Sequence, residues 1–97
     1  MFILELTYIR PERVDATRDD HMTWIRQRFE AGAFLASGRK TDGDGGVIIA
    51  VGDDQAEVEA LAATDPFVTG GVAEYRITGF RATTTAPALE TYRQQAG

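Results

Sequence analysis

Residues 2–9 are rich in β-branched and aromatic side chains, with Glu5 and Thr7 as the charged and polar positions, and this pattern predicts a β-strand. Its two faces carry Phe2, Leu4, Leu6 and Tyr8 on one side, and Ile3, Glu5, Thr7 and Ile9 on the other. Pro11 follows the strand. Because proline has a fixed backbone angle and no N–H, it suits the first turn of a helix, so we expect a helix to begin near it.

The next segment predicts an amphipathic helix from Glu12 to about Gly32. Larger side chains recur at spacings of three and four residues, among them Val14, Trp24 and Phe29. The opposite side of the predicted helix is mostly charged and should be solvated. Gly32 is a typical residue for ending a helix.

The rest of the chain predicts three more strands, a second helix and a tail. The second helix would end at Asp65-Pro66, since a residue before proline is steered away from helical geometry. Residues 82–97 read as a tail with a possible short helix at 88–95. The other predicted elements are a strand at Ala33–Ser37, a glycine-rich loop at residues 39–46, a strand at Gly46–Val51, a helix starting at Gly52-Asp53-Asp54 and a strand at Val72–Arg81.

The resulting order, βαββαβ, predicts an α+β fold of the ferredoxin-like type over residues 1–81. Such a fold has a four-stranded antiparallel sheet with two helices on one face. The strand at Gly46–Val51 is apolar on both faces, and Ile3 and Ile9 lie on the second face of the first strand. A second copy of the chain is the simplest cover for that face, so we expect a homodimer.

Composition narrows the function classes. The chain has 97 residues, 10 basic and 15 acidic, for a net charge of −5, which argues against nucleic acid or an anionic membrane as partner. It has no cysteine, which excludes disulfides, thiolate metal sites and a cysteine nucleophile. The start of the sequence does not resemble a signal peptide, and Val47–Val51 is too short to span a bilayer. We therefore expect a cytoplasmic protein.

The glycine-rich loop carries no recognisable ligand motif. Its sequence lacks the ligand positions of a calcium loop and the Gly-Lys-Ser/Thr of a phosphate-binding loop. With one histidine and no cysteine, a zinc site is also not expected. The loop is interpreted as a connection between strands, and no metal or cofactor is predicted.

His21 and Asp65 are the candidate chemical pair. His21, the single histidine, lies on the apolar side of its helix, where it is either a core-edge residue or a general acid/base. Asp65 at the end of the second helix either caps the turn that begins at Pro66 or points inward to His21. Both helices lie on one sheet face, so the two side chains can meet, and the carboxylate would then fix the imidazole tautomer.

Four further residues have open roles. Ser37 is either a turn residue or a hydroxyl facing a pocket. Trp24 and Phe67 are either core aromatics or pocket walls. Arg18 is expected to be exposed unless a partner binds it.

Three segments together resemble the YciI-like (YCII-related) domain family over about residues 1–81. They are Arg18-Asp-Asp-His21, then Phe34-Leu-Ala-Ser-Gly38, and finally Asp65-Pro66-Phe67 with Gly71-Val72 leading to Tyr75. The resemblance implies a ferredoxin-like domain that dimerises through its sheets into an α+β barrel. It also implies a pocket with a His–Asp pair, here His21 and Asp65, with Ser37 and Arg18 as neighbours.

The function implied by this resemblance is proton transfer on a small organic molecule, without a cofactor, in a lyase, isomerase or dehydrochlorinase reaction. In that role Asp65 would orient His21, Ser37 would bind a substrate oxygen, and Trp24 and Phe67 would form walls. Three alternatives stay open: a non-catalytic ligand-binding module, a purely structural dimer and a cofactor-free monooxygenase. The architecture hosts unrelated activities, so fold alone does not decide between them.

Overall fold

A single four-stranded antiparallel sheet forms one layer of the protein. The computed structural model describes residues 1–96. The strands are β1 (Phe2–Tyr8), β2 (Phe34–Arg39), β3 (Gly45–Ala50) and β4 (Ala73–Gly79). The strand order is β2-β3-β1-β4, so β1 lies between β3 and β4.

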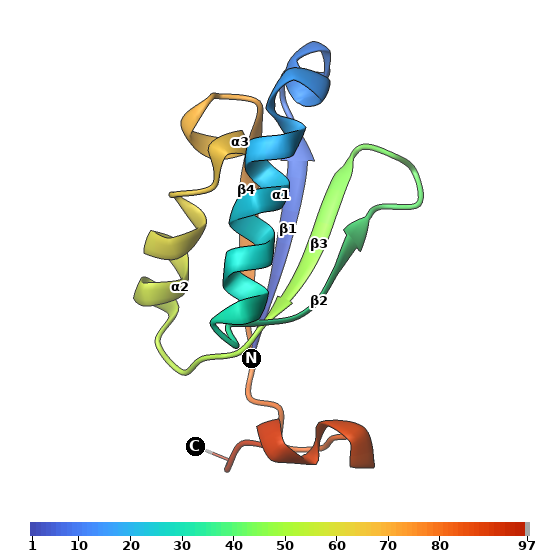
Figure 1. Cartoon of the computed structure of the whole chain (residues 1–97). Coiled ribbons are helices and arrows are strands. Elements are labelled where there is room, and N and C mark those ends of the chain that lie inside the picture. Colours follow the sequence, from blue (N-terminus) through green and yellow to red (C-terminus); the bar gives the residue numbers. More distant parts are fainter. Residues whose placement is uncertain (97) are drawn as a thin grey trace.

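Helices cover one face of this sheet, where α1 (Val14–Glu30) runs along the strands and α2 (Gln55–Ala62) and α3 (Pro66–Thr69) lie beside α1 (Figure 1). On the other side of α1, β2 and β3 extend beyond the helix (Figure 1). The predicted βαββαβ order and the ferredoxin-like fold are confirmed. The helical elements are η1 (Pro11–Arg13), α1 (Val14–Glu30), α2 (Gln55–Ala62), α3 (Pro66–Thr69) and η2 (Pro87–Tyr92), of which η1 and η2 are 3₁₀-helices.

The core lies between the sheet and the helices. Phe2, Leu4 and Leu6 are each at most 5% exposed and point to the helical side. Burying apolar side chains of this size stabilises a fold by about 1.5–3 kcal/mol each. Their main neighbours in the core are Trp24, Ile25, Phe34, Ile48, Ala50 and Val58 around Leu4, and Val14, Phe67 and Val72 around Leu6.

Element ends differ from the sequence expectations in three places. The first helix starts with a 3₁₀ turn at Pro11 and becomes α-helical only at Val14. A separate helix, α3, begins at Pro66, so the proline that ends one helix also starts another. The predicted short helix at residues 88–95 is instead the 3₁₀-helix η2. Gly32 ends α1 as predicted, with φ of 77°.

The second face of the sheet carries a mixture of apolar and charged side chains. Ile3 is 38% exposed there, and Val47 and Ile49 of β3 lie on the same face by register and are partly exposed. Lys40 reaches this face, where its Nζ lies 3.1 Å from Glu5 Oε2 and 3.2 Å from Thr7 Oγ1. Within residues 1–96, no helix combines the length and apolar character needed to cross a membrane.

Gly45 allows β3 to approach β1 closely, and this predicts a large effect of a single methyl group. Gly45 has φ of 151°, and a Cβ there would lie 1.8 Å from the Leu6 carbonyl oxygen. We expect Gly45→Ala to lower the free energy of unfolding by about 3 kcal/mol or more, because the backbone must move and is strained at this φ. Chemical denaturation measures the change.

Gly38 in the neighbouring strand is the matched control. A Cβ at Gly38 meets no atom within 4 Å, and Gly38 has no positive φ. Gly38→Ala should therefore change the free energy of unfolding by less than about 1 kcal/mol. Equal effects of the two substitutions would contradict the role given to the close contact at Gly45.

Candidate functional site

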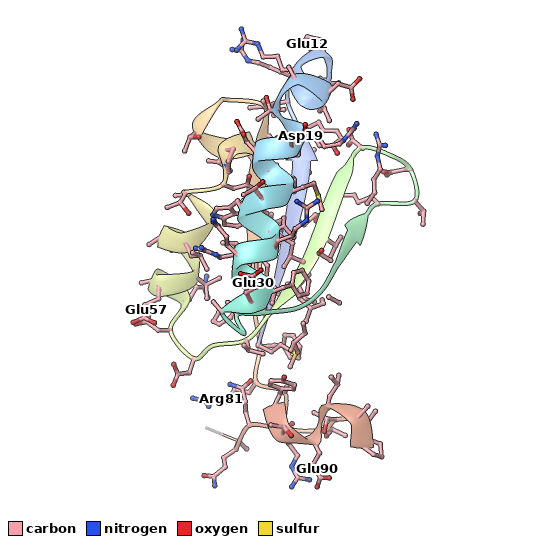
Figure 2. All side chains as sticks on the ribbon, viewed as in Figure 1. Glu12, Asp19, Glu30, Glu57, Arg81 and Glu90 are labelled. Carbon is pink, nitrogen blue, oxygen red and sulfur yellow. The ribbon has the colours of Figure 1, made fainter. Side chains whose placement is uncertain are left out.

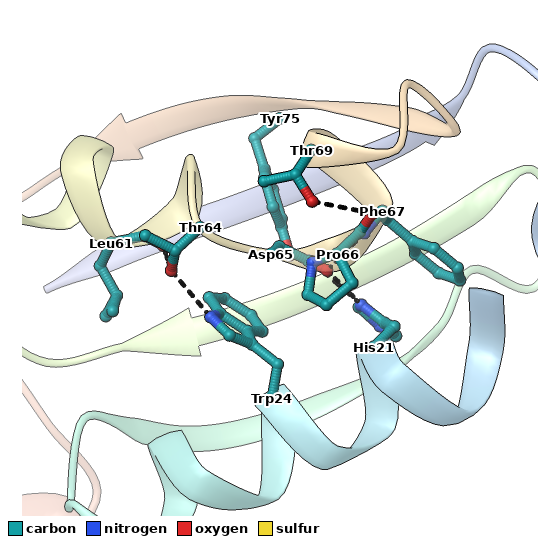
Figure 3. Close-up of polar contacts among 9 residues, drawn as sticks. All are labelled: His21, Trp24, Leu61, Thr64, Asp65, Pro66, Phe67, Thr69 and Tyr75. Atoms are coloured by element: carbon teal, nitrogen blue, oxygen red, sulfur yellow. Dashed lines mark hydrogen bonds and ion pairs between the residues drawn. The ribbon is translucent and has the colours of Figure 1, made fainter.

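His21 and Asp65 form a buried pair between α1 and the turn that starts α3 (Figure 3). His21 Nδ1 lies 2.8 Å from Asp65 Oδ1 and 3.0 Å from Asp65 Oδ2. Asp65 is fully buried, and the His21 side chain is 12% exposed. The structure thus brings together two residues that are 44 positions apart in the sequence.

The Asp65-Pro66-Phe67 segment explains how the carboxylate is held. Asp65 is the N-cap of α3, and its Oδ1 accepts a hydrogen bond of 2.9 Å from the Phe67 backbone N–H. Pro66 occupies the first helical turn, where its missing N–H costs nothing. Asp65 therefore caps a turn and also contacts His21, so the two roles considered for it are compatible.

Tyr75 is a third donor to Asp65, and the sequence analysis gave it no role. Its hydroxyl lies 2.5 Å from Asp65 Oδ2 and donates a hydrogen bond to it. Burial, followed by the negative charge of Asp65 and this hydrogen bond, raises the pKa of Tyr75 far above its ordinary value. The available sequence signal was the alternation of Ala73, Tyr75 and Ile77 with the charged Glu74 and Arg76, which puts Tyr75 on the apolar face of this strand.

The hydrogen bonds to Asp65 determine where the proton of a neutral His21 lies. A carboxylate only accepts hydrogen bonds, so Nδ1 carries the proton and Nε2 carries the lone pair. The imidazole is also stacked on the Phe67 ring, with 4.0 Å between centroids and 11° between planes. The stacking thus fixes the orientation of the ring, and the hydrogen bond to Asp65 fixes its tautomer. Nε2 is left available to accept a proton.

Trp24 supports the pair from one helical turn further along α1. It is buried, and its Nε1 donates a hydrogen bond of 2.9 Å to Thr64 Oγ1 (Figure 3). Because Thr64 precedes Asp65, the His21 and Trp24 contacts together tie α1 to residues 64–65. Trp24 does not line the cavity that is described in the next paragraph.

A cavity of about 270 Å³ lies between α1 and the strands β1, β2 and β3. His21, Arg18, Ser37 and Phe67 all line it. Its remaining lining residues are Leu6, Tyr8, Met22, Ile25, Gly38, Arg39, Gly45, Gly46, Val47 and Ile48. Four of the six residues singled out around the candidate pocket therefore meet at this cavity, and Asp65 lies directly behind His21.

A β-bulge brings Ser37 to this side of the sheet. The register of β2 on β3 shifts between Phe34 and Ala36. Simple alternation from the buried Phe34 would turn Ser37 away from the helices. The extra residue reverses the alternation, so that Ser37 lies opposite Ile48 on the helical face.

The side chains at the cavity can transfer a proton and bind polar groups. They offer an imidazole nitrogen, the Ser37 hydroxyl and the guanidinium groups of Arg18 and Arg39. Among residues 1–96, no three His, Cys, Asp or Glu side chains are close enough together to hold a metal ion.

A comparison of the sequence with known protein families identifies one family over most of the chain. The YCII-related domain matches residues 1–81. The chain belongs to the YCII-related domain family. No curated protein matches the sequence of this family member significantly.

A solved structure shares the fold of this YCII-related domain. It is 5-chloro-2-hydroxyhydroquinone dehydrochlorinase from Burkholderia phenoliruptrix AC1100 in complex with 2,5-dihydroxybenzoquinone. The TM-score is 0.63 at 16% sequence identity, over 82% of this chain and 93% of the dehydrochlorinase chain. At this identity the similarity shows a common fold.

The Tyr75 hydroxyl should stabilise the folded protein in a pH-dependent way. Tyr75→Phe removes one of three donors to a buried carboxylate, so we expect it to lower the free energy of unfolding by about 1–3 kcal/mol at neutral pH. In the unfolded chain tyrosine loses its proton near pH 10, whereas folded Tyr75 keeps it. The unfolded state then binds fewer protons, so wild-type stability should fall as pH rises above about 10.

Denaturation at several pH values, for the wild type, Tyr75→Phe and the control Tyr92→Phe, measures this effect. Tyr92 is 38% exposed on η2. The alkaline loss of stability should be smaller in Tyr75→Phe and unchanged in Tyr92→Phe. An identical alkaline slope in all three proteins would show that Tyr75 does not hold its proton in the fold.

Proposed function

We propose that this protein is an enzyme that removes a proton from a small organic molecule, with His21 as general base and Asp65 as its partner. The observation that carries the proposal is the buried His21–Asp65 pair, with His21 lining a cavity of about 270 Å³. Nε2 is the nitrogen not engaged by Asp65, so it is the atom that would accept the substrate proton. Proton removal by an imidazole requires no cofactor.

In the proposed step, Nε2 takes a proton from the substrate and the imidazole becomes positively charged. Asp65, held by the Phe67 N–H and the Tyr75 hydroxyl, stabilises that charge. The electron pair left on the substrate either shifts within it, so that return of the proton from Nε2 to another substrate atom gives an isomer, or expels a leaving group as an anion. A base of this kind typically accelerates a reaction by about 10²–10⁴-fold.

Ser37 has the proposed role of binding a substrate oxygen. Its hydroxyl is at the cavity because of the bulge in β2, and no hydrogen bond to another residue occupies it within residues 1–96. A hydroxyl can donate to a carbonyl or phenolate oxygen whose negative charge increases as the proton leaves. Phe67 would form one wall, and its stacking on His21 keeps the imidazole oriented.

The shared fold of the dehydrochlorinase supports an elimination as the reaction type. That protein is named for the removal of HCl from a chlorinated ring and was solved with a ring compound bound. The corresponding step here would pass a proton to His21 Nε2 and release chloride with its bonding electrons. Trp24 does not line the cavity. In the proposed reaction it would act only by holding α1 against residues 64–65.

The loss of His21 should abolish the reaction and leave the fold intact. We expect wild-type protein to release chloride from 5-chloro-2-hydroxyhydroquinone or to exchange substrate protons for deuterium, as measured by ion chromatography and NMR. His21→Gln should lower the rate by about 10²–10⁴-fold. Asp65→Asn should also lower it, because an amide can present its NH₂ to Nδ1 and favour the wrong tautomer.

Thr23→Ala is the control, since Thr23 is exposed on α1 and does not line the cavity. It should react at the wild-type rate. Normal turnover by folded His21→Gln would end the proposal. Tight binding of the ring compounds with no chloride release or proton exchange would favour a binding module instead.

We also propose that two copies of the chain pair through the open face of the sheet. Ile3 and Ile9 are 38% and 52% exposed, and Ile3 lies beside Ile49 on that face. The Lys40–Glu5 ion pair lies on the same face, and Lys40 is only 15% exposed. Exposed apolar side chains on a sheet face that carries no helices are typical of an association surface.

Ile3→Glu should convert the dimer to a monomer. A carboxylate at the centre of the paired sheets would be buried without a partner, so we expect the dimer to weaken by about a hundredfold or more. Light scattering after gel filtration measures the mass. Leu89→Glu is the matched control, since Leu89 is 39% exposed but lies on η2. A monomeric wild type, or equal dissociation of both variants, would contradict the sheet-to-sheet pairing.

A further inference from the structure

We infer that the cavity beside His21 takes a small planar anion with one ring, whose negative group is bound by Arg39. Arg39 is the last residue of β2, and no motif in the sequence marks it as a functional residue. It lines the same cavity as His21 and Ser37. The inference rests on the proposed function, because it names the substrate class for that site.

The cavity is positively charged although the protein is negative. The whole chain has a net charge of −5. The cavity lining includes two arginines, Arg18 and Arg39, and no aspartate or glutamate. The acidic side chains labelled on α1, Asp19 and Glu30, are exposed on the outside of the molecule (Figure 2). This segregation of charge favours an anion in the cavity.

Arg39 has no competing partner in the described part of the chain. Its side chain makes no ion pair or hydrogen bond within residues 1–96. The acids nearest to it in sequence, Asp42 and Asp44, are exposed in the β2–β3 loop and do not line the cavity. The guanidinium is therefore available to bind a carboxylate or phenolate through two parallel hydrogen bonds.

The same β-bulge that puts Ser37 on the helical face of the sheet also puts Arg39 on that face, where both side chains remain exposed. Arg39 lies opposite Gly46 and two residues beyond Ser37, so both side chains are on the helical face of β2. The next residue, Lys40, reaches the other face of the sheet, where it contacts Glu5. Arg39 and Lys40 are adjacent in the sequence but lie on opposite faces of the sheet, and only Arg39 lines the cavity.

Arg18 adds a second positive charge at the cavity. Its Nη1 lies 2.8 Å from Asp15 Oδ1, but the Asp15 side chain is 89% exposed. Exposed pairs of this kind hold their partners weakly because water screens the attraction. Arg18 can therefore turn from Asp15 to an anion in the cavity at little cost.

The volume and the walls limit the size and shape of the anion. The cavity of about 270 Å³ has apolar walls from Leu6, Met22, Ile25, Ile48 and Phe67. An apolar cavity of about 150 Å³ is sufficient for benzene. One ring with a few polar substituents therefore fits, whereas a nucleotide or a peptide would not be enclosed. The flat, parallel rings of His21 and Phe67 in the lining favour a planar ring, and the arginines favour its charge.

The test compares benzoate with benzamide, which have the same size and shape but differ in charge. Binding is followed by calorimetry and by the ring C–H signals of His21, the single histidine. We expect benzoate to bind about tenfold or more tightly than benzamide, because charge-assisted hydrogen bonds are stronger than neutral ones. Added salt should weaken the binding of benzoate more than that of benzamide.

Arg39→Gln should lower the affinity for benzoate by about tenfold or more and leave that for benzamide unchanged. Arg26→Gln is the matched control, since it removes the same charge from an exposed position of α1 outside the cavity. Benzoate that binds no better than benzamide, or that does not bind up to its solubility limit, would overturn the inference. Equal losses of affinity in the two variants would also overturn it.

His21→Gln separates this inference from the proposed function. Benzoate binding that persists in His21→Gln, in a protein whose wild type transfers no proton, would leave the anion site standing and remove the proposed reaction. Turnover that depends on His21, together with equal binding of benzoate and benzamide, would remove the anion site and leave the proposed reaction standing.

Discussion

The buried carboxylate of Asp65 is the constraint on which the rest of the site depends. A charged group without contact with water costs many kcal/mol unless it is paired and hydrogen-bonded. Asp65 meets this requirement with three donors from separate elements: His21 on α1, the Phe67 N–H on α3 and Tyr75 on β4. The helical layer and the sheet must therefore be correctly placed before any of these bonds can form, so the fold and the orientation of His21 are coupled.

Much of the fold follows from local patterns in the sequence. The β-branched and aromatic residues at 2–9 predict the first strand, and the three- and four-residue spacing predicts α1. Gly32 ends that helix through a backbone angle that other residues rarely adopt. The meeting of His21 and Asp65 was predictable because both helices lie on one sheet face. The second role of Asp65, as the cap of α3, was considered as an alternative to the pair, whereas one carboxylate has enough acceptor positions for both.

The rest of the site depends on non-local features. Tyr75 contacts Asp65 because β4 pairs with β1 in a register that places Tyr75 opposite Leu6, and no short motif specifies that register. The bulge near Leu35 reverses the alternation of β2, so the pattern of that strand alone assigns Ser37 and Arg39 to the wrong face. Trp24 was considered either a core aromatic or a pocket wall, and no local pattern decided between the two. Its indole N–H is directed to Thr64, and the ring is buried in the core.

The arrangement of charges links ligand binding to proton transfer. When Nε2 accepts a proton, it adds a positive charge to a cavity that already holds the guanidinium groups of Arg18 and Arg39. Asp65 offsets one positive charge from behind the imidazole. An anion bound at Arg39 would offset another from the cavity side, and the water it displaces would no longer screen these interactions. A charged substrate would thus favour the protonated imidazole more than a neutral substrate of the same shape, so one electrostatic feature would serve both recognition and reaction.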